Sequence, residues 1–274
     1  MYQGTLLPDS GALADLKTQH LKTLSAPLDA YWESALIGFA DHYELKIDGA
    51  RAGFYCVDAE QQLVAFYLSR EYENQGEAAL AYVLGEHGIK VALAGTNDAY
   101  FLSLCLDIAS SSRVHTLLFE DHLQAVPELE GFEELSFELA SKDDFPDIFA
   151  HYCAISGSLD EDSMESGYEG IKGYIQSVMD EHQIFVLRER GKLIATSECR
   201  ISETQKPYAD VGMIVAEAQR CKGVGSHILA RAKAFCYERE ALPICSCEAD
   251  NIGSKKAIQK AGFISRHRVV LAEF

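Results

Sequence analysis

One stretch of the C-terminal third, residues 208–229, contains the residue types that could bind a phosphorylated ligand. An apolar run, Val211–Val215, predicts a buried strand, and a polar loop with two glycines then leads into a helical pattern. The glycines let backbone amides approach a ligand without a Cβ in the way, and the first amides of a helix have no intrahelical partners. Because that helix end also carries positive partial charge, the stretch predicts an anion site suited to a pyrophosphate. The loop residues that would form this site are Arg220, Cys221, Lys222, Gly223, Val224, Gly225 and Ser226.

Two other phosphate-binding motifs do not fit this stretch. No Gly-Lys-Ser/Thr follows the glycines, which excludes a P-loop, and Ile228 stands where a dinucleotide fingerprint needs its third glycine. A second motif, Asn251-x-x-Ser254, lies downstream and leads to Lys260-Ala-Gly262-Phe263. One predicted helix and one predicted strand separate the two motifs.

In this order and at this spacing, the two motifs resemble those of the GNAT N-acetyltransferase superfamily, over roughly residues 183–274. The resemblance implies acetyl-CoA as a cosubstrate, with its pantetheine paired to the main chain of Ile214 and Val215. Backbone donors there would also polarise the thioester carbonyl. Asn251 would reach the pantetheine arm, with Ser254 nearby. An equal alternative is that Asn251 only caps its helix.

Acylation of an amine requires a neutral nucleophile, so a base or a chain of water molecules must take the proton. The acidic candidates are Glu198 and Asp210. If the hairpin that contains them turns near Gln205, Arg200 lies opposite Asp210 and Glu198 lies opposite a glycine. This register favours Glu198 as the base, whereas a slip of one residue would reverse the faces. The alternative for both acids is a charge on the sheet surface.

The resemblance also implies a general acid, a tyrosine in the helix that begins at Asn251. Ile258 stands at its place, so water is the expected proton donor to the leaving thiolate. His227 is a substitute candidate, and its alternative is packing against the first turn of the helix.

Composition limits the classes of partner. The 274 residues suit two domains of ordinary size, and the net charge of −18 disfavours nucleic acid as a partner. No apolar run reaches the ~20 residues that span a bilayer, and no signal peptide is recognisable, so the sequence predicts a cytoplasmic protein without a membrane partner. The eight cysteines form neither a disulfide framework nor a zinc motif, and no metal is expected. The sequence does not give the oligomeric state.

The N-terminal half repeats the order of elements of the C-terminal half. Strands at 43–47 and 52–57, joined by a hairpin signal at Asp48-Gly49, precede a strand at 62–68 and a helix from Gly76. Eight residues separate Leu68 from Gly76, as eight separate Val215 from Gly223. A strand at 89–93 and a helix that begins at Asn97 come next. A helical region at 10–40 precedes all of these elements. This order predicts two GNAT-like domains in tandem, with an unrelated α/β domain as the alternative.

The N-terminal copy lacks the phosphate-binding residues. Glu73 occupies the place of Arg220, Glu77 follows the glycine, and Ala78 replaces the second glycine. Acidic side chains repel phosphate, so this copy is not expected to bind CoA.

The predicted fold class is therefore α/β, in the α+β sense, with two GNAT-like domains, each a mixed, mostly antiparallel twisted sheet flanked by helices. The boundaries are 1–128 for the degenerate copy and 132–274 for the catalytic domain, with a linker at 121–134. In the second domain we expect strands at 135–139, 183–188, 192–201, 208–215, 244–248 and 263–271, and helices at 141–155, 171–179, 223–240 and 251–261.

The predicted function is an N-acetyltransferase that moves an acetyl group from acetyl-CoA to a primary amine of a small acceptor. Four carboxylates in the loop at 158–165 favour a cationic acceptor; they are Asp160, Glu161, Asp162 and Glu165. The alternative for these four is a solvated loop. Alternative functions are a catalytically silent CoA sensor and an interaction module whose acidic N-terminal half recruits a basic partner.

Overall fold

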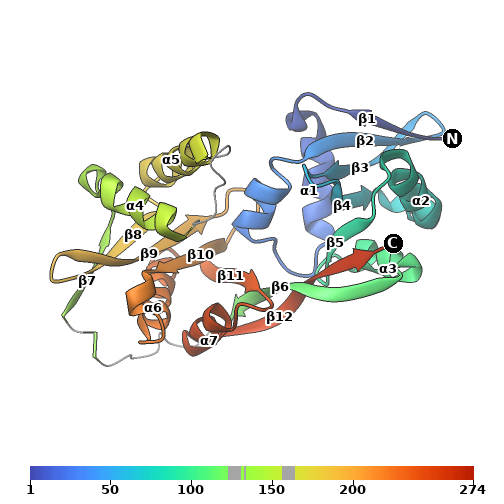
Figure 1. The fold of residues 1–274 in the computed structure, drawn as a ribbon. Coiled ribbons are helices and arrows are strands. Elements are labelled where there is room, and N and C mark those ends of the chain that lie inside the picture. The colour runs from blue at the N-terminus through green and yellow to red at the C-terminus, as the bar shows by residue number, and fades with distance from the viewer. Residues whose placement is uncertain (123–130, 133, 156–163) are drawn as a thin grey trace. The chain divides into compact units, whose positions relative to one another are not determined.

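The computed structural model of the chain describes residues 1–122, 131–132, 134–155 and 164–274 (Figure 1). The chain forms two compact units. The N-terminal unit comprises residues 1–118, 246–250 and 265–274, and the C-terminal unit comprises residues 119–245 and 251–264.

The N-terminal unit is a sheet with helices on both faces. Strands β1 to β4 are antiparallel neighbours, β4 pairs with β5 in parallel, and β5 pairs with the second half of β12 in antiparallel orientation. Asp48 and Gly49 both have positive φ, 51° and 82°, as a tight hairpin turn between two strands requires. The elements are β1 (Tyr2–Leu6), η1 (Ser10–Leu13), α1 (Ala14–Thr23), η2 (Tyr31–Leu36), β2 (Asp41–Ile47), β3 (Ala50–Val57), β4 (Gln62–Leu68), η3 (Arg70–Gln75), α2 (Gly76–His87), β5 (Val91–Gly95), α3 (Ala99–Ile108), β6 (Ser111–Asp121) and β12 (Phe263–Glu273).

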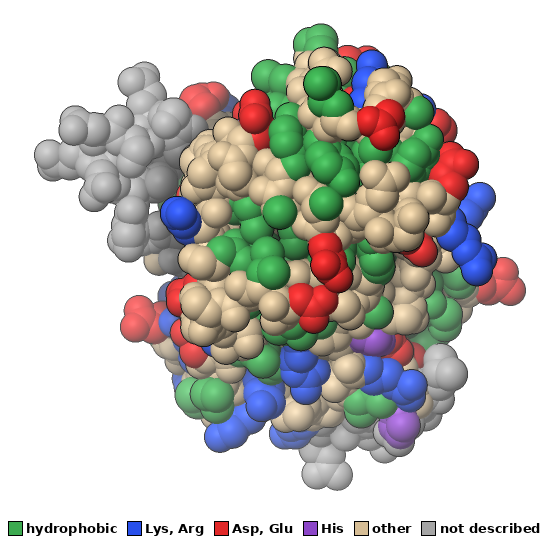
Figure 2. All heavy atoms as spheres, turned by 90° about the vertical axis from the view of Figure 1, so that its right-hand side faces the viewer, with side chains coloured by type: hydrophobic (Ala, Val, Ile, Leu, Met, Phe, Trp, Pro, Cys, Tyr) green, Lys and Arg blue, Asp and Glu red, His purple; other side chains and the backbone are tan. Residues whose placement is uncertain are grey.

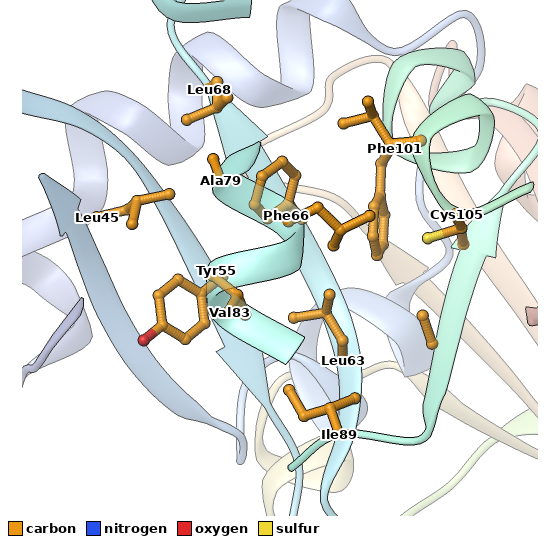
Figure 3. Packing of buried hydrophobic residues seen from close by; sticks show 14 of the residues in the cluster. Leu45, Tyr55, Leu63, Phe66, Leu68, Ala79, Val83, Ile89, Phe101 and Cys105 are labelled. Atoms are coloured by element: carbon orange, nitrogen blue, oxygen red, sulfur yellow. The ribbon is translucent and has the colours of Figure 1, made fainter. Parts of the chain in front are cut away.

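Alternation along the strands divides the buried side chains of this unit into two layers. On one face, Tyr55 and Phe66 of the sheet pack with Val83 of α2 and Phe101 of α3 (Figure 3). On the other face, Phe54 and Tyr67 pack in a second cluster with residues of α1 and η2. The sheet is therefore covered on both faces.

The C-terminal unit is also a sheet with helices on both faces. Strands β7 to β10 are antiparallel neighbours, and β10 pairs with β11 in parallel. Helices α4 and α5 pack on one face and α6 on the other (Figure 1). The elements are β7 (Leu135–Leu139), η4 (Lys142–Asp144), α4 (Phe145–Ile155), α5 (Met164–Asp180), β8 (Ile184–Glu189), β9 (Lys192–Ile201), β10 (Tyr208–Val215), η5 (Glu217–Gln219), α6 (Val224–Tyr237), β11 (Leu242–Glu248) and α7 (Ile252–Lys260).

Most elements lie where the sequence predicts them, and three differences have physical reasons. The region 10–40 is not one helix, because α1 ends at Thr23 and the chain continues through Pro27 to η2. Strand β11 begins at Leu242 and includes Pro243, two residues before the predicted start. The edge strand β1 and the long strand β6 were not predicted. The burial pattern of β1 does not alternate, and β6 begins with four exposed residues before it reaches the buried Leu117 and Phe119.

The two compact units are interleaved along the chain, since the last ten residues of the chain, nine of them in β12, belong to the N-terminal unit. The contiguous boundaries 1–128 and 132–274 remain a prediction about the repeated halves of the sequence. Residues 123–130 and 133 of the predicted linker and residues 158–163 of the acidic loop lie outside the described residues. Met164 and Glu165 belong to α5, and their side chains are not described.

The surface combines patches of different character. Figure 2 shows one face, on which hydrophobic side chains gather in the upper half and Lys and Arg gather in the lower half. An acidic chain thus still presents local basic surface. In the described part of the chain, no helix is both long and apolar enough to cross a membrane.

Candidate functional site

The loop from β10 to α6 forms the predicted anion site. Cys221 and Gly223 have positive φ, 62° and 88°, and they turn the chain so that the helix begins at Val224. In the described part of the chain, no side chain caps this helix end, and its first intrahelical donor is His227, whose N–H donates to the Gly223 carbonyl at 3.0 Å. The amides of Val224, Gly225 and Ser226 precede that bond, so their donors are available to an anion.

The two glycines of the loop are required for different reasons. At Gly223 the left-handed backbone is strained for any other residue, and a Cβ would lie 3.2 Å from the Phe132 ring. At Gly225 a Cβ would lie 2.8 Å from Sδ of Met213 on β10. The second glycine therefore lets α6 pack closely on β10, a role that the motif alone did not reveal.

Three basic side chains surround the loop. Arg220 Nε donates to the Val215 carbonyl at 3.3 Å, and Lys222 Nζ donates to Gln219 Oε1 at 3.1 Å. Lys260, at the end of α7, places Nζ 4.0 Å from the position of a Cβ on Gly223. Lys260 was not among the predicted site residues, although it belongs to the second sequence motif. Positive charge around the helix end favours an anion there.

Strand β10 leaves its parallel neighbour after a short ladder. It pairs with β11 from Tyr208 opposite Leu242 to Asp210 opposite Ile244, and the ladder stops there. On its other side β10 stays paired with β9 as far as Val215. One edge of β10 from Val211 to Val215 is thus free of a strand ladder, as binding of an extended ligand arm requires.

Other contacts fix the main chain of this part of β10. His151 of α4 is hydrogen-bonded through Nε2 to the Ile214 carbonyl at 3.1 Å. Burial lowers the pKa of His151, so its ring is neutral at physiological pH and donates this bond.

Asn251 accepts from the Ser254 amide at 3.0 Å and caps α7. The capping role of Asn251 is therefore observed, and its contact with pantetheine remains a proposal.

Glu198 lies at the centre of a hydrogen-bonded cluster on the α4/α5 face of the sheet. Tyr152 of α4 donates to Oε1 at 2.5 Å, and Tyr174 of α5 donates to Oε2. Burial, together with the charge of Glu198, raises the pKa of both tyrosines, so both hydroxyls stay protonated at neutral pH. Neither tyrosine was predicted, because both lie on helices far from Glu198 in the sequence.

The register predicted for the hairpin of β9 and β10 is confirmed. Arg200 lies opposite Asp210, and Glu198 lies opposite Gly212. Arg200 Nη2 is bonded to Asp210 Oδ2 at 2.5 Å, and its Nη1 donates to the Tyr174 hydroxyl at 3.2 Å. Asp210 is therefore the partner of Arg200, whereas Glu198 is linked to Arg200 both directly, at 3.3 Å, and through Tyr174.

The place of the family's tyrosine holds no proton donor, and His227, the substitute candidate, is packed against an aromatic ring. Ile258 is a buried apolar residue of α7. His227 stacks on Phe132 with ring centroids 4.5 Å apart, which corresponds to the packing alternative. In the region of Glu198, hydroxyl groups come from Tyr152 and Tyr174 instead.

The corresponding loop of the N-terminal unit is closed by its own side chains. A Cβ on Gly76 would lie 1.9 Å from the Tyr100 hydroxyl, which fills the space over the start of α2 and donates to the Glu73 carbonyl at 2.5 Å. The cap of α3 is Asp98, and Asn97 instead donates to the carbonyls of Ala26 and Pro27 at 3.1 and 3.3 Å. The prediction that Asn97 opens this helix as Asn251 does was wrong by one residue.

Comparison with protein families decides the identity of the fold. Residues 10–122 match the model of the acetyltransferase (GNAT) domain, and residues 145–263 match that of the acetyltransferase (GNAT) family. The chain belongs to the GNAT acetyltransferase family. Its two GNAT domains lie in tandem, which confirms the fold class and the repeat predicted from the sequence, and the family implies acetyl-CoA as the acyl donor.

Solved structures with the same arrangement include tandem GNAT proteins. An acetyltransferase of the GNAT family from Colwellia psychrerythraea has 25% sequence identity and a TM-score of 0.90, with 99% of each chain covered. A tandem GNAT protein from the clavulanic acid biosynthesis pathway has 12% identity and a TM-score of 0.66, with 99% of this chain and 97% of that chain covered. A GCN5-related N-acetyltransferase from Sphaerobacter thermophilus has 15% identity and a TM-score of 0.65, with 98% and 94% covered. A comparison with curated proteins found no match.

The remaining predictions concern metals and the acceptor. Among the described residues, no group of three or more His, Cys, Asp or Glu side chains could hold a metal ion. Asp160, Glu161 and Asp162 lie outside the described residues, so the acidic acceptor loop stays a prediction.

Proposed function

We propose that this GNAT protein transfers the acetyl group of acetyl-CoA to the primary amine of a small cationic acceptor, with the C-terminal unit as the catalytic domain. The observation that supports this best is the open start of α6, which has no side-chain cap and has basic side chains around it. The free edge of β10 beyond Asp210 supplies the second requirement, a main chain to which a pantetheine arm can pair.

The residues of the C-terminal unit fit acetyl-CoA. The amides of Val224 to Ser226 bind the pyrophosphate, and Lys260, Arg220 and Lys222 add positive charge. The main chain of Ile214 and Val215 orients the pantetheine arm. Bound acetyl-CoA supplies a thioester that is activated toward amines.

Glu198 acts as the base, and Tyr174 connects it to the amine. The Tyr174 oxygen accepts the proton of the attacking amine while its own proton passes to Glu198 Oε2, with which it is already hydrogen-bonded. Arg200, which donates to the same hydroxyl and is paired with Asp210, holds Tyr174 in position. Asp210 thus serves as a positioning residue rather than as the base.

The proposed binding of acetyl-CoA is tested at the start of α6. Gly223→Glu introduces bulk and negative charge where the amides meet the pyrophosphate, so isothermal titration should detect no binding of acetyl-CoA. Lys260→Glu, a change on the surface of α7, should weaken binding by tenfold or more without the backbone strain of a substitution at Gly223. Circular dichroism would establish that both variants are folded.

The control is Ala78→Glu, at an exposed position in the first turn of α2 that corresponds to Gly225 of the C-terminal copy. It adds the same charge to the first turn of α2, whose start Tyr100 covers at Gly76, so the affinity for acetyl-CoA should not change. Unchanged affinity in folded Gly223→Glu and Lys260→Glu variants would contradict the assignment of the site.

A second candidate function is a CoA-binding sensor without turnover. It is favoured by Ile258, a buried apolar residue at the place where a general acid is expected. Release of free thiol from acetyl-CoA in the presence of a panel of amines separates the two functions, because a sensor binds acetyl-CoA and releases no thiol.

A further inference from the structure

The N-terminal unit contains a cavity of about 520 Å³ that the acetyl-CoA site does not use. Its volume lies within the ~300–1,000 Å³ that is usual for small-molecule sites. Helix η2 and the residues after it form one wall, and the turn between β3 and β4, strands β5 and β6 and the end of β11 form the rest. All of these residues belong to the N-terminal unit.

Aromatic side chains supply much of the wall. Trp32 is 6% exposed and packs in the cluster between the sheet and α1, so its ring is a fixed surface. Asp29 holds the start of η2 by accepting the Trp32 amide at 2.7 Å. In contrast, Tyr31 is 58% exposed and Phe39 88% exposed, although both line the cavity. Exposed aromatic rings beside a cavity indicate a surface that a ligand covers.

The negative charge of the cavity wall favours a positively charged ligand. Of the described residues, three carboxylates line the cavity, those of Asp58, Glu60 and Glu248, whereas no described Lys or Arg does. Asp58 is fixed by the turn that contains it, since its Oδ1 accepts the amides of Glu60 and Gln62 at 3.0 and 2.8 Å. A concave wall of one sign concentrates ions of the opposite sign. The phosphates of CoA are therefore excluded from this cavity.

We infer that this cavity binds an organic ammonium ion with an apolar body. Aromatic rings attract cations through their π faces and also bury apolar groups, and the carboxylates neutralise the positive charge. The inference goes beyond the proposed function, because the ligand can be the acceptor amine or a separate effector that is not acetylated.

The chain provides its own probe of this cavity. Trp32 is the one tryptophan among the 274 residues, so its fluorescence reports on the cavity wall without labelling. Titration with 2-phenylethylammonium and with benzyltrimethylammonium should change the emission of Trp32 in a saturable manner. The neutral 2-phenylethanol and the anionic phenylacetate should bind at least about fivefold more weakly than 2-phenylethylammonium.

Variants of the wall separate specific from general binding. Phe39→Ala and Glu248→Gln change exposed side chains and should each weaken both ammonium probes by about fivefold. The matched controls are Leu106→Ala and Asp107→Asn on α3, which are also exposed, lie outside the cavity and should leave the affinities unchanged. Absence of a saturable response, equal affinity for 2-phenylethanol, or unchanged affinity in both wall variants would overturn the inference.

The two sources of the ligand are distinguished by a rate measurement. If 2-phenylethylammonium is acetylated and Glu248→Gln raises its KM, the cavity holds the acceptor. If the ammonium probes bind and their binding leaves turnover unaffected, the cavity serves a separate ligand. A quaternary ammonium cannot be acetylated, so binding of benzyltrimethylammonium tests the cavity even if the protein has no acetyltransferase activity.

Discussion

At the scale of single residues, the environment of Glu198 determines what this carboxylate can do. Both oxygens accept tyrosine hydroxyls, and the residue is 8% exposed, so an amine cannot reach it without displacing a partner. The two tyrosines differ in their surroundings. Tyr152 is buried, whereas Tyr174 is 39% exposed and also receives a hydrogen bond from Arg200. Tyr174 is thus the member of the cluster that a substrate can approach.

Removal of the Tyr174 hydroxyl should interrupt proton transfer. Tyr174→Phe keeps the ring, whose centroid lies 6.4 Å from that of Tyr152 on α4. It should lower kcat by about tenfold or more at neutral pH, while the affinity for acetyl-CoA is unchanged. Glu198→Gln should lower kcat by about 10²-fold or more. Both deficits should shrink at alkaline pH, where the acceptor amine is already deprotonated. A pH profile of kcat measures this.

Tyr152→Phe is the matched control. It also removes one donor to Glu198, but in the buried part of the cluster, so it should lower the free energy of unfolding by about 1–3 kcal/mol and change kcat less than Tyr174→Phe does. If Tyr152→Phe reduces kcat as strongly as Tyr174→Phe does, Tyr174 does not carry the proton.

The sequence predicted only the local part of this cluster. The pairing of Arg200 with Asp210 follows from a hairpin whose turn the sequence marks, so the opposite positions can be counted. Tyr152 and Tyr174 come to Glu198 through the packing of α4 and α5 on the sheet, and no spacing in the sequence encodes that contact. Lys260 reaches Gly223 in the same way, through the end of α7.

At the scale of elements, the regular strands and the glycine loop were predictable because local periodicity and backbone requirements specify them. Strands β9 and β10 have the predicted bounds, and α6 begins one residue after Gly223. The end of the ladder between β10 and β11 was implied by the family resemblance rather than by any property of Val211–Val215. Ladder length depends on how helices on both faces direct the two strands, which is tertiary information.

His151 connects α4 to the free part of β10 and should make stability depend on pH. Burial lowers its pKa below the ordinary value of 6.5, so the unfolded chain binds the proton more readily than the folded one. The contribution of neutral His151 to the free energy of unfolding is therefore complete above about pH 6.5, and it decreases as the pH falls below that value. His151→Gln keeps a donor to the Ile214 carbonyl and should reduce this loss, as urea unfolding at pH 7.5 and pH 5.5 would measure.

The N-terminal unit contains a comparable residue, His42, whose pKa burial also lowers. His42→Gln is therefore the control for the location of the effect. Fluorescence of Trp32 reports on unfolding of the N-terminal unit. The acid sensitivity of this signal should therefore decrease in His42→Gln and stay unchanged in His151→Gln. If His151→Gln leaves the acid sensitivity of acetyl-CoA binding and of the far-UV signal unchanged, His151 is not a source of it.

At the scale of the whole molecule, the two units differ at the start of their corresponding helices. The C-terminal unit keeps an open helix start at Gly223, whereas the N-terminal unit fills the corresponding space with Tyr100 and places Glu73 and Glu77 around it. Burial and these two acids raise the pKa of Tyr100 to about 12, so its hydroxyl remains neutral. One molecule of acetyl-CoA per chain is the expected stoichiometry.

The last residues of the chain follow the C-terminal GNAT domain in sequence but form part of the N-terminal unit. Val269 to Glu273 of β12 pair with Gly95 to Val91 of β5 in the N-terminal unit, and Leu271 is buried there. Leu271→Ala should therefore destabilise the N-terminal unit by about 2–5 kcal/mol, the usual cost of a buried leucine. Hydrogen exchange should become faster in β4 and β5, while α6 keeps its protection and its acetyl-CoA affinity. Leu106→Ala, at an exposed leucine of α3, should have little effect. Equal loss of protection in α6 and β5 would mean that the two units unfold together, and that the contiguous halves of the sequence are not separate in stability.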